Sequence, residues 1–322
     1  MNEKKLKIFT GNSNVKLARE VASSLGIKLG KASVKKFADG EINLKIGESV
    51  RRNDVFVIQS LSPPQNDHLM ELLIFLDALR RASAERITAV IPWYAYSRQD
   101  TKIGPRDPIS AKLVADLLQV AGADRILAVD LHSEQIQGFF NVPVDNLSFS
   151  FIAAAYFNKK KLNNLCVVSP DVGGVKRARN FANLLKARLA IIDKRRPREN
   201  ESEVMHVIGK VKGKTCILFD DIIDTGGSMC NGAKALKENG AKKVIAVASH
   251  GLFSRDAIQK IEKSEIKEMI VSNSVPVKLK GKNKIKFLSI GPLLAEAIDH
   301  IHKGKSVSEL FREEKFRQVK IV

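Results

Sequence analysis

Short apolar runs rich in β-branched residues alternate along this chain with amphipathic stretches of helical period. The apolar runs predict buried strands at Leu6–Thr10, Asp54–Ser60, Ile87–Pro92, Ile126–Leu131, Leu165–Pro170, Leu189–Lys194, Thr215–Asp220 and Lys243–Ser249. The stretches between them predict helices, among them Asp67–Arg81, Ile109–Ala121, Gly174–Lys186, Ser228–Asn239 and Pro292–His302. Near-continuous apolar strands separated by helices are typical of parallel sheets covered on both faces. The sequence therefore predicts an α/β fold with mainly parallel sheets flanked by helices.

One stretch departs from this pattern. Within Lys35–Ile46, the residues Ile42, Leu44 and Ile46 alternate with polar ones after the turn pair Asp39-Gly40. Alternation with a period of two indicates a strand that is buried on one face only. We expect an antiparallel hairpin here.

The segment Gly122–His132 resembles Gly240–His250, and each predicts a helix-ending glycine, a short loop, a buried strand and a histidine just past the strand. Chance reuse of a common connection explains such a match. Two related α/β domains in tandem also explain it. The second reading predicts a boundary near Leu147, with domains at 1–147 and 148–322.

The charge balance favours anionic partners but does not select one. The 322 residues include 54 Lys plus Arg and 35 Asp plus Glu, a net charge of +19. Aromatic residues make up 6%, with one Trp, which is poor material for stacking nucleic-acid bases. We therefore prefer scattered surface charge to nucleic-acid binding.

Cysteine usage and hydropathy predict the compartment. Cys166, Cys216 and Cys230 form no C-x-x-C pair, and three cysteines make no disulfide framework. The first residues contain no apolar signal segment, and no apolar run reaches the length of about 18 residues that spans a membrane. We expect a cytoplasmic protein with buried thiols and no membrane association.

The strongest motif joins the strand before Asp220 and Asp221 to the string Asp224-Thr225-Gly226-Gly227-Ser228 at a helix start. The two glycines let backbone N–H groups approach an anion, the hydroxyls add donors, and the helix N-terminus supplies partial positive charge. These features predict a cradle for one phosphate monoester, with the carboxylates facing sugar hydroxyls. The alternative is an ordinary strand–turn–helix with Asp and Ser as caps. No Gly-Lys-Ser/Thr follows, so this is not a Walker loop.

Other polar clusters follow predicted strands, where open α/β sheets bind ligands. They are Arg98-Gln99-Asp100, His132, Asp171 and Lys194-Arg195-Arg196. An imidazole and a carboxylate suit Mg²⁺ carried by substrate phosphates, and the cations suit a transferred phosphoryl group. Each cluster also has an interpretation without a functional role: a solvated loop, a structural histidine or a solvated basic run.

The hairpin tip, Phe37-Ala-Asp39-Gly-Glu41, places a ring beside two acceptors, which would suit a purine. Phe37 as an ordinary core residue is the alternative. No nucleophile or zinc motif stands out, so the clusters together favour phosphoryl transfer by positioning and electrostatics.

These motifs, in order and over nearly the whole chain, resemble the ribose-phosphate pyrophosphokinase family, and most closely its phosphate-activated class. The matching strings span Phe37–Glu41, Pro92–Asp100, Val129–His132, Ile136–Phe140, Ser169–Gly174, Lys194–Pro197, Asp220–Ser228 and Ser289–Ala297. The resemblance implies two tandem domains of phosphoribosyltransferase-like fold. It also implies transfer of the β,γ-pyrophosphoryl group of ATP to ribose 5-phosphate, with Mg²⁺ as cofactor.

The resemblance assigns roles position by position. The positions that match ATP-binding residues are Phe37, Asp39, Glu41, Arg98, Gln99 and Asp100. Those that match ribose 5-phosphate-binding residues are Asp220, Asp221, Asp224, Thr225, Gly226, Gly227 and Ser228. His132 and Asp171 match metal-binding positions, and Lys194 and Arg196 match the catalytic cations.

The resemblance further implies a homohexamer, activated by phosphate and inhibited by ADP. The matching effector positions are Ser49, Arg51, Ser306 and Ser308. Arg52-Asn53 stands where the family more often has a turn with glycine. The alternative to an active enzyme is a non-catalytic regulatory paralogue. Because the chain keeps Lys194 and Arg196, we favour activity.

Overall fold

The computed structural model describes residues 5–195, 204–279, 281 and 283–311. It divides into two compact units. Unit 1 holds the described residues up to Ser148, together with Ser274–Pro276 and Ile290–Phe311, and unit 2 holds Phe149–Asn273 and Val277–Ser289. The chain first passes from one unit to the other next to the predicted boundary. The segment Ile290–Phe311, which we expected in the C-terminal domain, belongs to unit 1.

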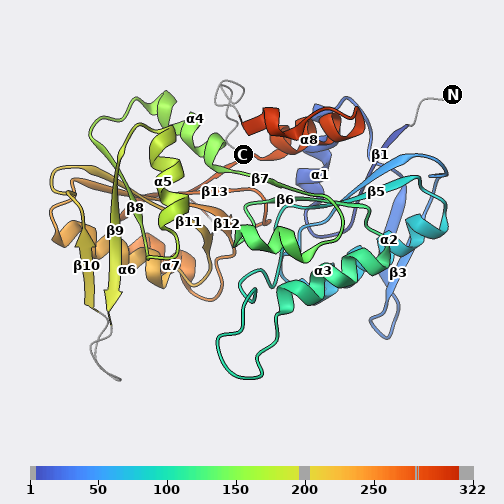
Figure 1. Cartoon of the computed structure of the whole chain (residues 1–322), viewed down its shortest axis with the longest axis horizontal. Helices are drawn as coiled ribbons and strands as arrows, with labels where there is room; N and C mark the ends of the chain where they lie inside the picture. The colour runs from blue at the N-terminus through green and yellow to red at the C-terminus, as the bar shows by residue number, and fades with distance from the viewer. Residues whose placement is uncertain (1–4, 196–203, 280, 282, 312–322) are drawn as a thin grey trace. The chain divides into compact units, whose positions relative to one another are not determined.

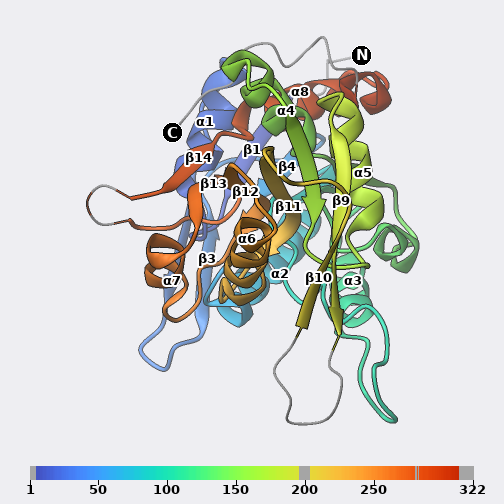
Figure 2. The same ribbon diagram turned by 90° about the vertical axis from the view of Figure 1, so that its left-hand side faces the viewer.

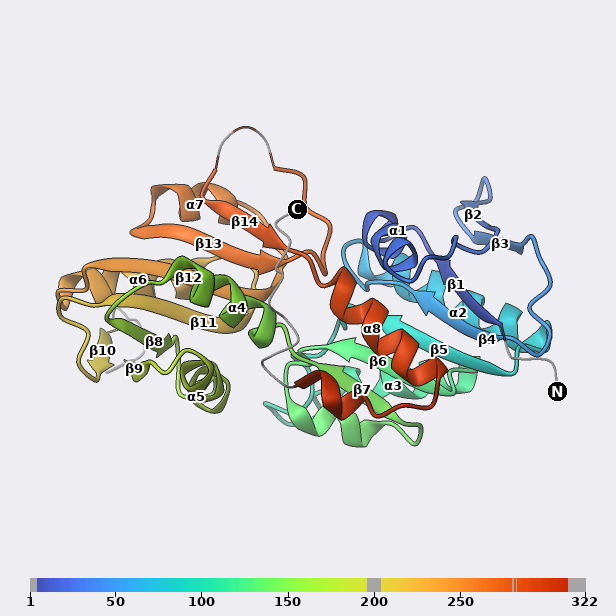
Figure 3. The same ribbon diagram turned by 90° about the horizontal axis from the view of Figure 1, so that it is seen from above.

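Unit 1 is built on five parallel strands that lie in chain order. They are β1 (Leu6–Thr10), β4 (Asp54–Ile58), β5 (Arg86–Ile91), β6 (Arg125–Val129) and β7 (Val144–Leu147). Helices α2 (Gln65–Arg81) and α3 (Ser110–Ala121) cover one face, and α1 (Val15–Ser24) and α8 (Gly291–His302) cover the other (Figure 1). Figure 3 shows α8 running across the strands of this unit. The short 3₁₀ helices η1 (Glu134–Phe139) and η2 (Val307–Phe311) complete it.

Local signals set the ends of these elements. The Asn14 side chain accepts a hydrogen bond from Leu17 N and so caps the start of α1. Gly122 ends α3 in the left-handed conformation, with φ of 119°. β4 is buried along its whole length, as expected of a central parallel strand.

The predicted hairpin is present and forms a separate two-stranded sheet. β2 (Ala32–Lys36) pairs antiparallel with β3 (Ile42–Ile46), and Lys36 lies opposite Ile42. Gly40 has φ of 96°, which the turn needs and glycine adopts without steric cost.

Unit 2 is a seven-stranded sheet with the order β10-β9-β8-β11-β12-β13-β14. Its strands are β8 (Leu165–Ser169), β9 (Arg188–Arg195), β10 (Val204–Ile208), β11 (Thr215–Ile223), β12 (Lys243–Gly251), β13 (Ile266–Ser272) and β14 (Ile285–Leu288). Within this sheet, the β10–β9 pair is antiparallel and the other pairs of described strands are parallel. The α/β prediction is confirmed.

The order of strands in unit 2 reverses between β8 and β11. After β8 the chain passes through α5 (Val175–Leu184) to β9, and after β11 it passes through α6 (Gly227–Glu238) to β12 on the other side. The two helices lie on opposite faces of the sheet (Figure 2), as the usual right-handed crossover requires for connections that run to opposite sides. α4 (Ser150–Lys160) lies on the side of α5, and α7 (Ala257–Lys263) on the side of α6 (Figure 1). Ligands of such sheets bind where the order reverses.

The two repeated segments fold alike up to their histidines. Gly122 and Gly240 both have positive φ after a helix and before a buried strand. His132 lies beyond β6, as predicted. His250 lies inside β12 and is fully buried, so the prediction that it follows its strand was wrong. β12 continues further than β6 because β11 extends beside it as far as Ile223, with Ile222 opposite His250.

Candidate active site

The candidate phosphate cradle sits where β11 passes into α6 in unit 2. Gly226 adopts the left-handed conformation, with φ of 77°, and its carbonyl accepts the first helical hydrogen bond from Cys230 N, at 3.0 Å. The N-cap position is Gly226, which has no side chain with which to cap the start of α6. A methyl group added at Gly227 would meet nothing within 4 Å, so the loop is open there. Backbone N–H groups at such an open helix start suit a phosphate.

Two carboxylates at the end of β11 flank this cradle, and one arginine bridges them. Arg177 Nη1 lies 2.5 Å from Asp221 Oδ1 and 3.0 Å from Asp220 Oδ1. Asp221 N also donates to Asp220 Oδ1, at 2.9 Å. Burial, followed by the charge of Asp221, raises the pKa of Asp220 to about 8, and the Arg177 charge opposes that rise.

The loop after β8 holds Asp171 in a tight turn. Ser169 Oγ donates to the Asp171 carbonyl at 2.7 Å, and Gly174 N donates to Asp171 Oδ1 at 2.9 Å. A Cβ at Gly174 would lie 3.0 Å from Ser169 Oγ, so the turn fits glycine closely. Because β8 and β11 are neighbours, Asp171 and the bridged carboxylates emerge at the same edge of the sheet.

In unit 1 the hairpin tip presents Phe37 to solvent. Its ring is 52% exposed, which excludes the reading of Phe37 as a core residue. Asp39 Oδ1 accepts a hydrogen bond from Glu41 N, and Phe37 N donates to the Glu41 carbonyl, so the turn is ordered internally. An ion pair between Lys36 and Asp67 ties the hairpin to α2.

The loop after β5 carries Gln99 and Asp100 and is joined to two other elements. Ser110 Oγ, at the start of α3, donates to Gln99 Oε1 at 2.5 Å. Asp100 Oδ2 accepts from Ser133 Oγ at 2.5 Å. The structure thus brings Asp100 next to the loop of His132 within unit 1.

The remaining predicted residues divide between the units and the undescribed segments. His132 lies in unit 1 and Asp171 in unit 2, so the two predicted metal ligands belong to different units. Among the described residues, no group of three or more His, Cys, Asp or Glu side chains is arranged to hold a metal ion. The Lys194 backbone lies in β9, opposite Met205 of β10. The Lys194 side chain and Arg196 lie outside the described residues.

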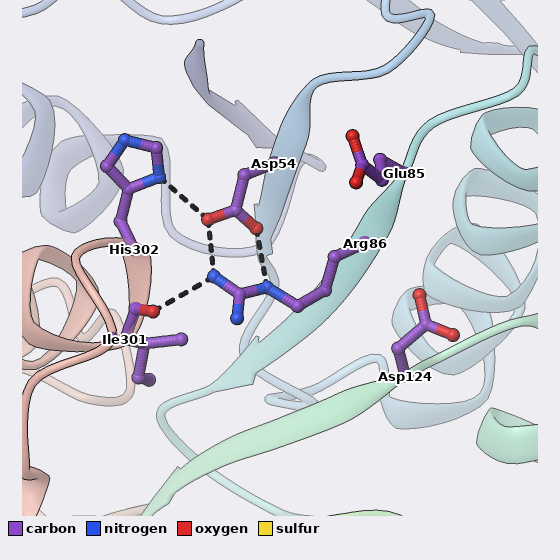
Figure 4. A pocket seen from close by; sticks show the side chains of 7 residues that line it. Asp54, Glu85, Arg86, Asp124, Ile301 and His302 are labelled. Carbon is purple, nitrogen blue, oxygen red and sulfur yellow. Dashed lines mark hydrogen bonds and ion pairs between the residues drawn. The ribbon is translucent and has the colours of Figure 1, made fainter. Parts of the chain in front are cut away.

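Unit 1 has a pocket of about 340 Å³ whose lining includes residues close in sequence to the two predicted effector segments (Figure 4). Its lining includes Asp54, Arg86 and His302, none of which the sequence analysis singled out. The buried Asp54 carboxylate accepts from Arg86 Nε and from His302 Nδ1, each at 2.8 Å. Arg86 Nη2 donates to the Ile301 carbonyl at 3.0 Å. These contacts fix the end of α8 against β4 and β5.

The loops on either side of these contacts carry the four predicted effector residues, all of which are exposed: Ser49, Arg51, Ser306 and Ser308. His300 Nδ1 donates to the Ser306 carbonyl at 2.8 Å, and Arg52 N donates to the Ser83 carbonyl at 2.9 Å. Arg52 has φ of 58°, a conformation that glycine adopts more readily, so the unusual turn keeps a glycine-like backbone.

Two parallel α/β units, one with a glycine-rich helix start after paired carboxylates, define a phosphoribosyltransferase-like protein. Residues 6–122 match the family model of the N-terminal domain of ribose phosphate pyrophosphokinase, and residues 194–312 match that of the phosphoribosyl synthetase-associated domain. The chain belongs to the ribose-phosphate pyrophosphokinase family.

Individual relatives are similar over almost their full length. A ribose-phosphate pyrophosphokinase from Bacillus caldolyticus is 56% identical over 307 residues, which cover 95% of this chain and 98% of that protein. One from Bacillus subtilis is 54% identical over 96% of this chain and 98% of that protein. The crystal structure of phosphoribosylpyrophosphate synthetase from Mycobacterium smegmatis matches with a TM-score of 0.89 at 45% identity, over 94% of this chain and all of that one.

In the part of the chain that the structure describes, every helix is too short or too polar to cross a membrane.

Proposed function

We propose that this chain transfers the β,γ-pyrophosphoryl group of ATP to the anomeric hydroxyl of ribose 5-phosphate. The products are 5-phosphoribosyl 1-pyrophosphate and AMP. The anomeric oxygen forms a bond to the β-phosphorus, the bond from that phosphorus to the α,β-bridging oxygen breaks, and the anomeric hydroxyl loses its proton. The observation that carries the proposal is identity above 50% over the full length of enzymes that bear this activity in their name.

The ribose 5-phosphate site lies in unit 2. The open start of α6, from Asp224 to Ser228, holds the 5-phosphate through backbone N–H groups and hydroxyls. Asp220 and Asp221 accept hydrogen bonds from the ribose hydroxyls. The support for this assignment is the bridged carboxylate pair, followed in the chain by a helix start whose N-cap is glycine.

The ATP site draws on unit 1. The exposed Phe37 ring stacks on the adenine, and Asp39 and Glu41 flank it. Arg98, Gln99 and Asp100 bind the rest of the nucleotide. The support is a ring held out from the core on an ordered turn, and a loop fixed to α3 through Gln99.

Mg²⁺ fits the residues that are present. His132 and Asp171 offer one imidazole and one carboxylate, and Mg²⁺ takes few protein ligands because it keeps water and substrate phosphates. When bound, Mg²⁺ would neutralise charge on the transferred group.

Lys194 and Arg196 stabilise the transition state. Lys194 lies in β9, which pairs with β8 in the sheet of unit 2, and Arg196 follows two positions later in the sequence. Cations placed there lower the energy of charge that develops on the transferred group and the leaving AMP.

The chain works as a cytoplasmic homohexamer of the phosphate-activated class, with ADP as inhibitor. The effector residues Ser49, Arg51, Ser306 and Ser308 sit on loops that the contacts of Asp54 hold in one region of unit 1. An Arg and three Ser side chains are suitable donors to phosphate oxygens.

Steady-state kinetics with Asp221→Ala test the sugar site. The assay mixes protein, Mg²⁺-ATP, ribose 5-phosphate and added phosphate, and follows AMP. We expect the KM for ribose 5-phosphate to rise far more than the KM for ATP. Equal rises in both would mean that the sugar site lies elsewhere. Folded wild-type protein that makes no AMP would instead identify a non-catalytic regulatory paralogue.

A further inference from the structure

Arg177 is a charged residue of unit 2 to which the sequence analysis and the proposed function give no role. It lies in the first turn of α5, the helix that follows β8 and the Asp171 turn. Its side chain is 26% exposed, while that of Asp221 is 3% exposed. A single guanidinium nitrogen, Nη1, lies within hydrogen-bond distance of one oxygen of each carboxylate.

The topology explains how this helix reaches the carboxylates. β8 and β11 are neighbours, and their following helices leave toward opposite faces of the sheet. An arginine in the first turn of α5 therefore spans the place where the strand order reverses. Ligands of open α/β sheets bind at that place. Arg177 thus lies at the edge of the proposed sugar site and belongs to the element opposite the phosphate cradle.

The electrostatics explain what the contact does. Two adjacent carboxylates with little solvent repel each other, and the charge of Arg177 opposes the rise in the pKa of Asp220 that burial and this repulsion cause. Arg177 supplies a permanent positive charge to both. It also fixes Oδ1 of each carboxylate, and Asp221 N adds a second donor to Oδ1 of Asp220. The pair is therefore held in one orientation before any ligand arrives.

We propose that Arg177 is a positioning residue that orients Asp220 and Asp221 for the vicinal hydroxyls of ribose, and so sets the preference of the enzyme for a sugar with both hydroxyls. The inference rests on the proposed sugar site. Arg177 acts through the carboxylates and need not contact substrate. Its loss therefore weakens recognition of the sugar hydroxyls and leaves ATP binding in place.

The test compares Arg177→Gln and Arg177→Lys with Arg179→Gln. Arg179 is an exposed arginine of the same helix, so its substitution makes the same change of charge. Each variant is assayed with ribose 5-phosphate and with 2-deoxyribose 5-phosphate as acceptors. Circular dichroism and thermal unfolding establish that each variant is folded. If Arg177→Gln does not fold, Arg177→Lys takes its place.

We expect Arg177→Gln to raise the KM for ribose 5-phosphate by about 30-fold, as for loss of a charge-assisted hydrogen bond, and the KM for ATP by less than about twofold. The preference for ribose over deoxyribose should fall by about tenfold. Arg177→Lys should recover part of both losses, because lysine restores the charge without the planar guanidinium. Arg179→Gln should match the wild type.

Two results would overturn the inference. One leaves the proposed sugar site intact, and the other removes it as well. Unchanged ribose preference in folded Arg177→Gln, with Asp221→Ala still impaired for ribose 5-phosphate, would remove the role of Arg177 and leave the sugar site intact. No effect on ribose 5-phosphate from Asp221→Ala would remove the sugar site and this inference together.

Discussion

Phe37 is the residue whose exposure indicates its role most clearly. A half-exposed aromatic side chain at the tip of an ordered hairpin contributes little to the core. Its substitution should therefore change the stability of the folded protein little. We expect Phe37→Ala to raise the KM for ATP by about tenfold, because stacking on a base is worth about 1–3 kcal/mol. The free energy of unfolding should change by less than about 0.5 kcal/mol.

Ile208→Ala is the matched control for Phe37. Ile208 is a similarly exposed apolar side chain on β10 in unit 2. We expect it to leave the KM for ATP unchanged. If Phe37→Ala also leaves this KM unchanged, or if it destabilises the protein strongly, the stacking role is wrong.

At Lys194, the proposed role predicts a loss in the chemical step alone. Lys194→Ala should lower kcat by about three orders of magnitude or more while ATP still binds, because the lost interaction belongs mainly to the transition state. Equilibrium titration of ATP and initial rates of AMP release provide the two measurements. A variant with full turnover, or one that no longer binds ATP, contradicts the assignment.

Single residues differ in how far the sequence reveals them. The string Asp220–Ser228 predicts a phosphate cradle because glycines, hydroxyls and a helix start are all local features. Arg177 was not predicted, since its contacts with the carboxylates depend on β8 lying next to β11, which no local pattern encodes. Asp54 and His302 were missed for the same reason, because they are far apart in sequence and meet only in the folded unit.

At the scale of elements, the conformation of the turn into α6 depends more on Gly226 than on Gly227. Gly226 has φ of 77°, and Gly227 begins the helix with open space around it. A side chain in the left-handed conformation costs about 1 kcal/mol. We expect Gly226→Ala to lower the free energy of unfolding by about that amount, and Gly227→Ala to change it by less than about 0.5 kcal/mol. Equal losses in chemical denaturation would contradict the turn geometry.

A buried carboxylate joins α4, β13 and β14 in unit 2. Glu268 Oε1 lies 2.8 Å from the Nζ atoms of both Lys160 and Lys286, and accepts from Tyr156 Oη at 2.5 Å. Burial alone would raise the pKa of Glu268, but these hydrogen bonds outweigh it and lower the pKa from 4.5 to about 2. The ionised form therefore stabilises the folded state above about pH 4.5, and this contribution is lost as the pH falls toward 2.

We accordingly expect Glu268→Gln to destabilise the protein by about 2 kcal/mol at pH 7, less than for a fully buried pair because both lysines are partly exposed. The difference from wild type should shrink between pH 4.5 and pH 2. Glu238→Gln removes an exposed pair with Lys234 on α6 and should cost less than about 0.5 kcal/mol. A Glu268→Gln deficit that does not vary with pH would refute the ionic role.

Elements were predictable where their pattern is self-contained. The strands leading to the site and the helices α2, α3, α5 and α6 were predicted to within a few residues, because each has a continuous apolar run or a clear face. α1 and β13 were not predicted. Membership of a unit was harder still, since α8 packs on unit 1 although it follows the last strand of unit 2 in sequence.

For the whole molecule, the return of α8 to unit 1 makes that unit discontinuous in sequence. Ile8 and Phe56 are fully buried, and the residues next to them in β1 and β4 belong to the core that packs under α2 and α3. Because side chains alternate along a strand, Ile8 and Phe56 face the other side of the sheet. A fragment of residues 1–148 lacks α8 and the His302 contact with Asp54. We expect this fragment to bind a hydrophobic dye and to unfold without a cooperative transition. The full chain should bind no dye and should unfold cooperatively. A cooperatively folded fragment would show that α8 is dispensable.

The central claim is that the whole chain moves a pyrophosphoryl group and not a single phosphoryl group. Phosphorus NMR of a mixture of the protein, Mg²⁺-ATP, ribose 5-phosphate and phosphate follows every product at once. We expect AMP and 5-phosphoribosyl 1-pyrophosphate in equal amounts, with no ADP. Formation of ADP with a ribose bisphosphate, or unchanged ATP in the presence of folded protein, would contradict it.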